Sequence, residues 1–182
     1  MTEVRTAGKL GYCFGVSQAI EKAIKYADEH GKVYSLGTLA HNEDVVELLR
    51  QHGVEPIKVE DIQPNTHVAI TAHGAPPEIY RKIEEMGCSC LDCTCPIVRK
   101  AQLVVSTQLD SFDILIFGDP DHQEVIGLNG WAKGPERCFQ GAKFIGNGTD
   151  LFSAGGELVD LKLGKKVGVI SQTTKVPTMF AG

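Results

Sequence analysis

The hydrophobic positions of the chain alternate between two periods. Short apolar runs, such as residues 67–72 and 112–118, have the length of buried strands, whereas residues 17–30 repeat apolar residues as one face of a helix does. By this pattern we expect strands at 32–37, 54–59, 67–72, 88–93, 112–118, 143–145 and 166–171, and helices at 17–30, 43–53, 76–87 and 96–109. The pattern weakens after residue 122. Helix-length segments between the strands favour parallel pairing.

This alternation predicts an α/β fold of two similar small lobes, each a mainly parallel sheet flanked by helices. We expect the division near Cys95, so that residues 1–95 form the first lobe and residues 96–182 form the second.

Composition and charge narrow the class of protein. A hydrophobic content of 42% and a charged content of 23% are ordinary for a soluble globular protein. The net charge of −5 argues against a broad surface for nucleic acid. No apolar run approaches the roughly 18 residues of a membrane span, and the amino terminus lacks the order of a secretory signal. We therefore expect a cytoplasmic protein that binds neither nucleic acid nor membrane.

Five residues with reactive side chains occupy one kind of position, where a predicted strand gives way to the start of a helix. They are Cys13, His41, His73, Cys95 and His122. In an open α/β sheet, ligands bind at the carboxyl ends of the strands, where helix N–H groups point outward. Thiolates and imidazoles at this edge suggest a metal centre beside a pocket for an anion. Glu124 adds a carboxylate that can relay protons.

Two simpler interpretations compete with this hypothesis. A single histidine is more often structural than functional, and the argument depends on three that share one kind of position. The C-x-C-x-x-C-x-C segment from Cys88 to Cys95 is also compatible with a zinc-binding structural domain. On a strand, however, Cys88 and Cys90 face away from Cys93, which favours small core residues. Cys95 differs because a helix N-terminus follows it and favours the thiolate.

Six segments carry a family resemblance. They are Gly11–Val16, Leu39–Asn42, Ala72–Gly74, Thr94–Val98, His122–Gly127 and Ser171–Thr174. Their order and approximate spacing resemble the 4-hydroxy-3-methylbut-2-enyl diphosphate reductase family. These LytB-type iron–sulfur oxidoreductases catalyse the last step of non-mevalonate isoprenoid biosynthesis. The resemblance covers essentially the whole chain.

The resemblance implies a role for each candidate residue. Cys13 and Cys95 resemble two of the three thiolates that hold a 4Fe-4S cluster. His41 and His73 resemble the histidines that bind the diphosphate, and His122 resembles the one near the substrate hydroxyl. Glu124 resembles the carboxylate that delivers a proton, and Thr173 resembles the threonine that orients it.

The implied reaction is the reductive dehydroxylation of an allylic diphosphate. Its products are isopentenyl and dimethylallyl diphosphate, and its electrons come from a donor such as ferredoxin or flavodoxin.

The sequence also departs from the family pattern. The family has three lobes, and its third cluster cysteine lies in a third lobe that nothing here matches. Cys93 and Cys138 are spare thiols at other places. We therefore expect a fragment or a short homologue with impaired activity alone. The alternative is a non-catalytic iron–sulfur or diphosphate-binding module.

Overall fold

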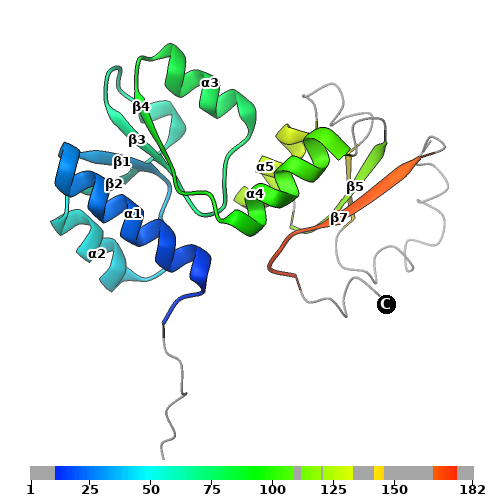
Figure 1. The fold of residues 1–182 in the computed structure, drawn as a ribbon, viewed down its shortest axis with the longest axis horizontal. Helices are drawn as coiled ribbons and strands as arrows, with labels where there is room; N and C mark the ends of the chain where they lie inside the picture. The colour runs from blue at the N-terminus through cyan, green and yellow to red at the C-terminus, as the bar shows by residue number, and fades with distance from the viewer. Residues whose placement is uncertain (1–10, 109–111, 120, 133–141, 146–165, 176–182) are drawn as a thin grey trace, which may run out of the picture.

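The chain folds into two separate parallel sheets. The structure is a computed structural model that describes residues 11–108, 112–119, 121–132, 142–145 and 166–175. The first sheet has the order β2-β1-β3-β4, and the second has the order β6-β5-β7, with parallel pairing throughout (Figure 1). The strands are β1 (Val33–Leu36), β2 (Val54–Ile57), β3 (His67–Ile70), β4 (Ser89–Asp92), β5 (Asp113–Phe117), β6 (Ala142–Ile145) and β7 (Val167–Ser171). The predicted α/β fold with two parallel-sheet lobes is confirmed.

The described residues form five α-helices, of which α1 precedes β1 and the other four connect strands. They are α1 (Phe14–His30), α2 (Glu43–Gln51), α3 (Pro77–Glu85), α4 (Pro96–Leu103) and α5 (Gln123–Trp131). A 3-10 turn, Val59–Asp61, follows β2, and a π-helical turn, Val104–Gln108, follows α4. None of the described helices is both long and apolar enough to cross a membrane.

Two helix boundaries differ from the sequence prediction by three residues or more, the start of α1 and the end of α4. α1 begins three residues before Ser17, and the N–H of Ser17 already bonds the carbonyl of Cys13 at 3.0 Å. Cys13 makes no side-chain cap, so the sequence carries no signal for this start. The regular α4 helix ends at Leu103, where the hydroxyls of Ser106 and Thr107 bond the Leu103 carbonyl. Such side-chain bonds compete with the helical backbone pattern.

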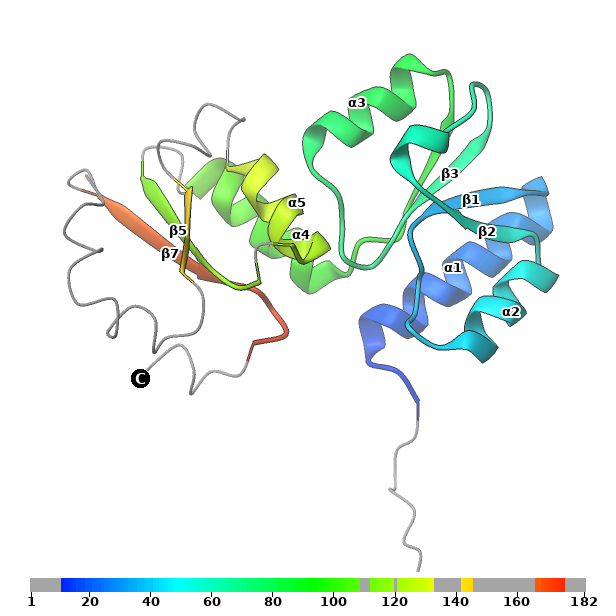
Figure 2. The ribbon, with the colours of Figure 1, turned by 180° about the vertical axis from the view of Figure 1, so that it is seen from behind.

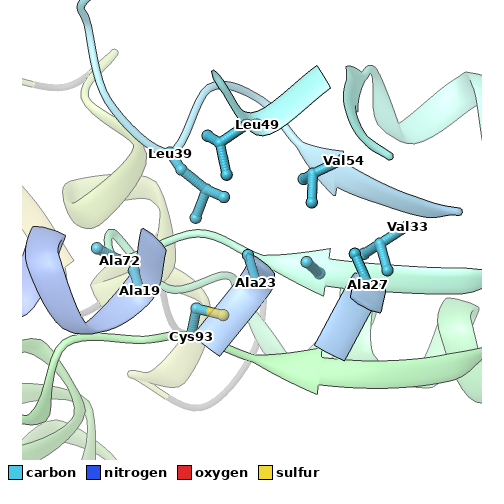
Figure 3. Close-up of a cluster of buried hydrophobic side chains, with 10 residues drawn as sticks. Ala19, Ala23, Ala27, Val33, Leu39, Leu49, Val54, Ala72 and Cys93 are labelled. Atoms are coloured by element: carbon cyan, nitrogen blue, oxygen red, sulfur yellow. The ribbon is translucent and has the colours of Figure 1, made fainter. Parts of the chain in front are cut away.

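Small residues bring α1 close to the first sheet. Four buried positions of α1 recur every four residues, at Gly15, Ala19, Ala23 and Ala27. The three alanines pack with side chains of the sheet and with Leu39, Leu49 and Cys93 (Figure 3). Residues four apart share one helix face, so this stripe lets the helix backbone approach the strands.

The opposite face of the first sheet is covered by α3. Side chains alternate along β3, so Ala69 faces the α1 cluster while Val68 and Ile70 face the other side. There they pack with Ile83 of α3. Both faces are therefore buried, as expected for a parallel sheet.

The second sheet packs against α4 and α5, which lie between the two sheets in both views (Figures 1 and 2). Ile114 and Ile116 of β5 pack with Val125 and Leu128 of α5. The apolar residues of α5 lie on several sides of the helix rather than in one stripe. For this reason, the helical pattern of the sequence weakens after His122.

The two lobes meet where α5 contacts the loop between β3 and α3. Trp131 Nε1 donates a hydrogen bond to the carbonyl of Ala75 at 2.9 Å. A Cβ added at Gly130 would overlap the Cβ of Pro76 and lie 3.1 Å from its Cα. At Gly127, one turn earlier, the nearest atom would be Gln102 Nε2 at an ordinary 3.5 Å. The contact between the lobes therefore leaves no room for a side chain at Gly130.

These two glycines give a matched pair of variants in one helix. Gly127→Ala should raise the free energy of unfolding by up to about 1 kcal/mol, because alanine favours the helix. Gly130→Ala should lower it by roughly 1–3 kcal/mol, because the methyl group overpacks against Pro76. Thermal melting of the two variants checks this. Equal melting temperatures would contradict the tight contact at Gly130.

Candidate active site

Three histidines come together at the carboxyl ends of the strands. His41 lies between β1 and α2, His73 follows β3, and His122 is the N-cap of α5. The ring centroids of His41 and His73 are 6.2 Å apart. Those of His73 and His122 are 5.4 Å apart, with the rings nearly perpendicular at 86°. His73 and His122 come from different lobes, so the contact between the lobes places them together.

A cavity of about 510 Å³ lies beside these rings. His41 and His73 line it from the first lobe, and Gln123 and Ile126 of α5 line it from the second. Hydrophobic side chains, among them Ile70 and Ile79, line much of the remainder. His122 does not line this cavity, although the next residue does. A cavity with two imidazoles and an apolar lining suits a ligand that has both an anionic end and an apolar end.

His73 has an altered pKa. Burial lowers the pKa of His73, and the neighbouring His122 and His41 lower it further, because a second positive charge beside them is unfavourable. The Thr71 hydroxyl lies 3.3 Å from His73 Nδ1. A bound anion would oppose both effects, so protonation of His73 and anion binding should favour each other.

Glu124, two residues after His122, is almost fully buried, with 1% of its surface exposed. Its carboxylate accepts hydrogen bonds from the Thr173 N–H at 2.6 Å and from Thr173 Oγ1 at 2.9 Å. The Glu124 N–H in turn donates to His122 Nδ1 at 3.2 Å. Because Nδ1 accepts, a neutral His122 carries its proton on Nε2. The predicted group of His122, Glu124 and Thr173 is thus a connected hydrogen-bond network.

Gln172, which lies within the Ser171–Thr174 segment, holds Thr173 in place, a role that the sequence did not indicate. Gln172 is buried, and its N–H bonds the Phe117 carbonyl at 2.8 Å. Its Oε1 accepts from the Asp119 N–H at 3.0 Å. These bonds tie the end of β7 to the end of β5. The only sequence signal is the position of Gln172 beside Thr173 at the end of a strand.

Cys13 and Cys95 are the N-cap residues of α1 and α4, and the first turn of α1 lies against Cys95. A Cβ added at Gly15, in the first turn of α1, would lie 2.5 Å from Cys95 Sγ. The N–H of Cys95 bonds the carbonyl of Ala72 at 2.9 Å. Cys95 is therefore fixed to the residue that precedes His73. The thiolate is the form in which cysteine binds iron.

The other described cysteines are not arranged as a zinc site. Cys93 is buried against α1, and burial raises the pKa of its thiol to about 11, which disfavours a thiolate ligand. Cys88 packs on the α3 face of the same sheet. The four cysteines therefore do not converge, and the hypothesis of a local zinc site is wrong. Cys138 lies outside the described residues.

The described residues fit part of an iron–sulfur site. Cys13 and Cys95 have the right chemistry, whereas nowhere in the described ranges do three His, Cys, Asp or Glu side chains gather as a metal site. Two large apolar side chains next to these cysteines are exposed, Phe14 at 70% and Ile97 at 65%.

Comparison with protein families shows which family the chain belongs to. The model of a family described as "LytB protein" matches residues 4–181. A 4-hydroxy-3-methylbut-2-enyl diphosphate reductase of Dehalococcoides mccartyi is 38% identical over 181 residues, which are 98% of this chain and 59% of that protein. One of Clostridium acetobutylicum is 37% identical over 180 residues, which are 96% of this chain and 26% of that protein. The chain thus spans three fifths or less of the length of these relatives.

Solved structures give the same result. A structure described as (E)-4-hydroxy-3-methyl-but-2-enyl diphosphate reductase, the terminal enzyme of the non-mevalonate pathway, matches with a TM-score of 0.75 and 32% identity, covering 94% of this chain and 58% of that one. The E-1-hydroxy-2-methyl-but-2-enyl-4-diphosphate reductase of Plasmodium falciparum matches with a TM-score of 0.77 and 26% identity, covering 94% and 51%.

The pKa of His73 gives a direct test of the histidine geometry. His122→Asn should raise it, and His41→Asn should raise it less, because His122 is the stronger of the two neighbours. Proton NMR titration of the ring resonances measures both shifts. The ring resonances of His52, which pairs with Asp28 at 2.9 Å, should be the same in all three proteins and serve as the internal control. Equal His73 titration in all three proteins would mean that the rings do not lie together.

Proposed function

We propose that this chain, which belongs to the LytB protein family, functions in the reductive dehydroxylation of 4-hydroxy-3-methylbut-2-enyl diphosphate to isopentenyl and dimethylallyl diphosphate. One observation carries the proposal: three imidazoles lie together, two of them in the lining of one cavity, and the Cys95 N–H bonds the residue that precedes His73. The relatives that bear this activity by name support it.

In this proposal, His41 and His73 bind the diphosphate. The pKa of His73 is lowered in the ligand-free chain, so its charge is largely absent until an anion arrives. The anion then favours the imidazolium, which donates a charge-assisted hydrogen bond. The apolar side chains of the cavity, such as Ile126, contact the hydrocarbon part of the substrate.

We assign the proton delivery to Glu124. Two donors from Thr173 hold its carboxylate in one orientation, and burial keeps bulk water away. Its task is to protonate the oxygen that leaves the allylic carbon. His122 presents a proton on Nε2 when neutral, and we assign it to the hydroxyl group of the substrate.

Cys13 and Cys95 would hold an iron–sulfur cluster. Such a cluster, when bound, supplies electrons and a Lewis-acidic iron for the hydroxyl group. A ferredoxin- or flavodoxin-type protein would supply the two electrons that the reaction consumes. We assign Phe14 and Ile97, exposed beside the two cysteines, to contact with the part of the enzyme that provides a third ligand.

One observation favours a second candidate function. No group of three possible metal ligands gathers among the described residues, which suits a diphosphate-binding module without turnover. Iron loading separates the two candidates, because such a module would bind diphosphate without retaining iron.

The anion site and the thiol site should be separable by mutation. His41→Ala and His73→Ala should weaken binding of inorganic diphosphate while iron uptake under anaerobic reconstitution is retained. Cys13→Ser and Cys95→Ser should lower iron uptake and leave the binding of diphosphate unchanged, because each removes a thiolate. Calorimetry and iron analysis measure the two properties. His52→Ala and Cys88→Ser are controls that should change neither. Loss of both properties in every variant would contradict these assignments.

The 182-residue chain alone should hold its cluster weakly and turn over little. Metal affinity depends on the number of ligands and on a preformed site, and two thiolates fall short of the three that the family uses. Anaerobic reconstitution followed by a reductase assay with a strong artificial reductant tests this. Robust turnover by monomeric chain would contradict it and would point to Cys93 or Cys138 as a ligand. Serine variants of each would show which.

A further inference from the structure

The turn that carries His73 packs on Gln102 of α4. Gly74, the residue after His73, has a φ of +74°, which favours glycine. A Cβ added there would overlap Nε2 of Gln102 and lie 3.1 Å from Thr94 Cγ2. The turn therefore contacts the Gln102 amide directly, without an intervening side chain.

Gln102 is a buried polar side chain whose amide has no hydrogen-bond partner among the described residues. Only 1% of its surface is exposed, and neither Nε2 nor Oε1 forms a hydrogen bond within the described part of the chain. Burying an amide without hydrogen bonds lowers stability, because the bonds to water are lost and not replaced. Exchanging the nitrogen and oxygen of the amide would not help, since both atoms lack partners.

A purely structural role would be filled better by an apolar residue. Methionine has the same length and no branch, and it would pack at this position without an unpaired amide. The location of Gln102 suggests why a polar group is present. Its amide lies against Gly74, the residue that follows His73. Gly127 of α5 lies close both to this amide and to the backbone of Ala75. A small movement of the turn would bring backbone polar atoms to the amide.

We infer that Gln102 is a positioning residue for the anion site. Its amide hydrogen-bonds the backbone of the 73–75 turn when an anion bound to His73 draws the turn into its ligand-bound position. The unpaired amide raises the free energy of the ligand-free chain, and the new hydrogen bond stabilises the bound one. Anion binding is therefore favoured by the free-energy difference of the Gln102 amide between the ligand-free and the ligand-bound chain. This inference rests on the proposed diphosphate site.

The test is Gln102→Met in the 182-residue chain, with inorganic diphosphate as the probe. The variant should melt about 2–4 °C higher than wild type without ligand, because an unpaired buried amide has been removed. Its Kd for diphosphate, measured by calorimetry, should be about two- to tenfold weaker, because a hydrogen bond of the bound state is lost. A residue that only fills space would not change these two quantities in opposite directions.

Val105→Ala is the matched control, since Val105 lies one turn further along and packs in the core of the second lobe. It should lower the melting temperature and leave the Kd unchanged. An unchanged Kd in Gln102→Met would overturn the inference. A lower melting temperature would overturn it too, because the amide would then be bonded in the ligand-free chain.

A wrong proposed function would give a different result in these measurements. If wild type binds no diphosphate, the diphosphate site is wrong, and the His73 ring resonances then decide the role of Gln102. A shift of the His73 resonances in Gln102→Met, with those of His52 unmoved, would support the contact with the turn. Unchanged His73 resonances would overturn it.

Discussion

The candidate site depends on one contact, the packing of the loop after β3 against α4 and α5. His73 belongs to the first lobe, whereas His122 and Glu124 belong to the second. Their geometry exists because the Trp131 N–H bonds the Ala75 carbonyl and because Gly130 lets Pro76 approach α5. A rotation between the lobes would separate the imidazoles, remove the electrostatic cause of the lowered His73 pKa and open the cavity. The chemistry is therefore a property of the interface between the lobes.

Cys95 is connected to the same turn. The stripe from Gly15 to Ala27 lets α1 lie against the first sheet, so the first turn of α1 reaches Cys95. The bond from the Cys95 N–H to the Ala72 carbonyl then links this thiol to the histidine turn. One stretch of backbone thus connects Cys95 to the turn that carries His73.

Much of this arrangement could be predicted from sequence. Parallel strands end at one edge of a sheet, so the strand-end positions of His41 and His73 predict their proximity. The alternation along β4 likewise predicts that Cys88 and Cys93 lie on opposite faces. Gln102 and Gln172 were not predictable, because their roles depend on contacts with residues distant in sequence. The early start of α1 was missed because Cys13 gives no capping signal.

Each sheet is built from a continuous stretch of chain, since β1 to β4 lie within residues 33–92 and β5 to β7 within residues 113–171. During synthesis, the first sheet can form before the second has left the ribosome, because domains fold as units from the amino terminus. The order of translation is then also the order of assembly. The histidine turn is in place first, α5 docks onto it next, and Thr173 arrives last to fix the carboxylate of Glu124.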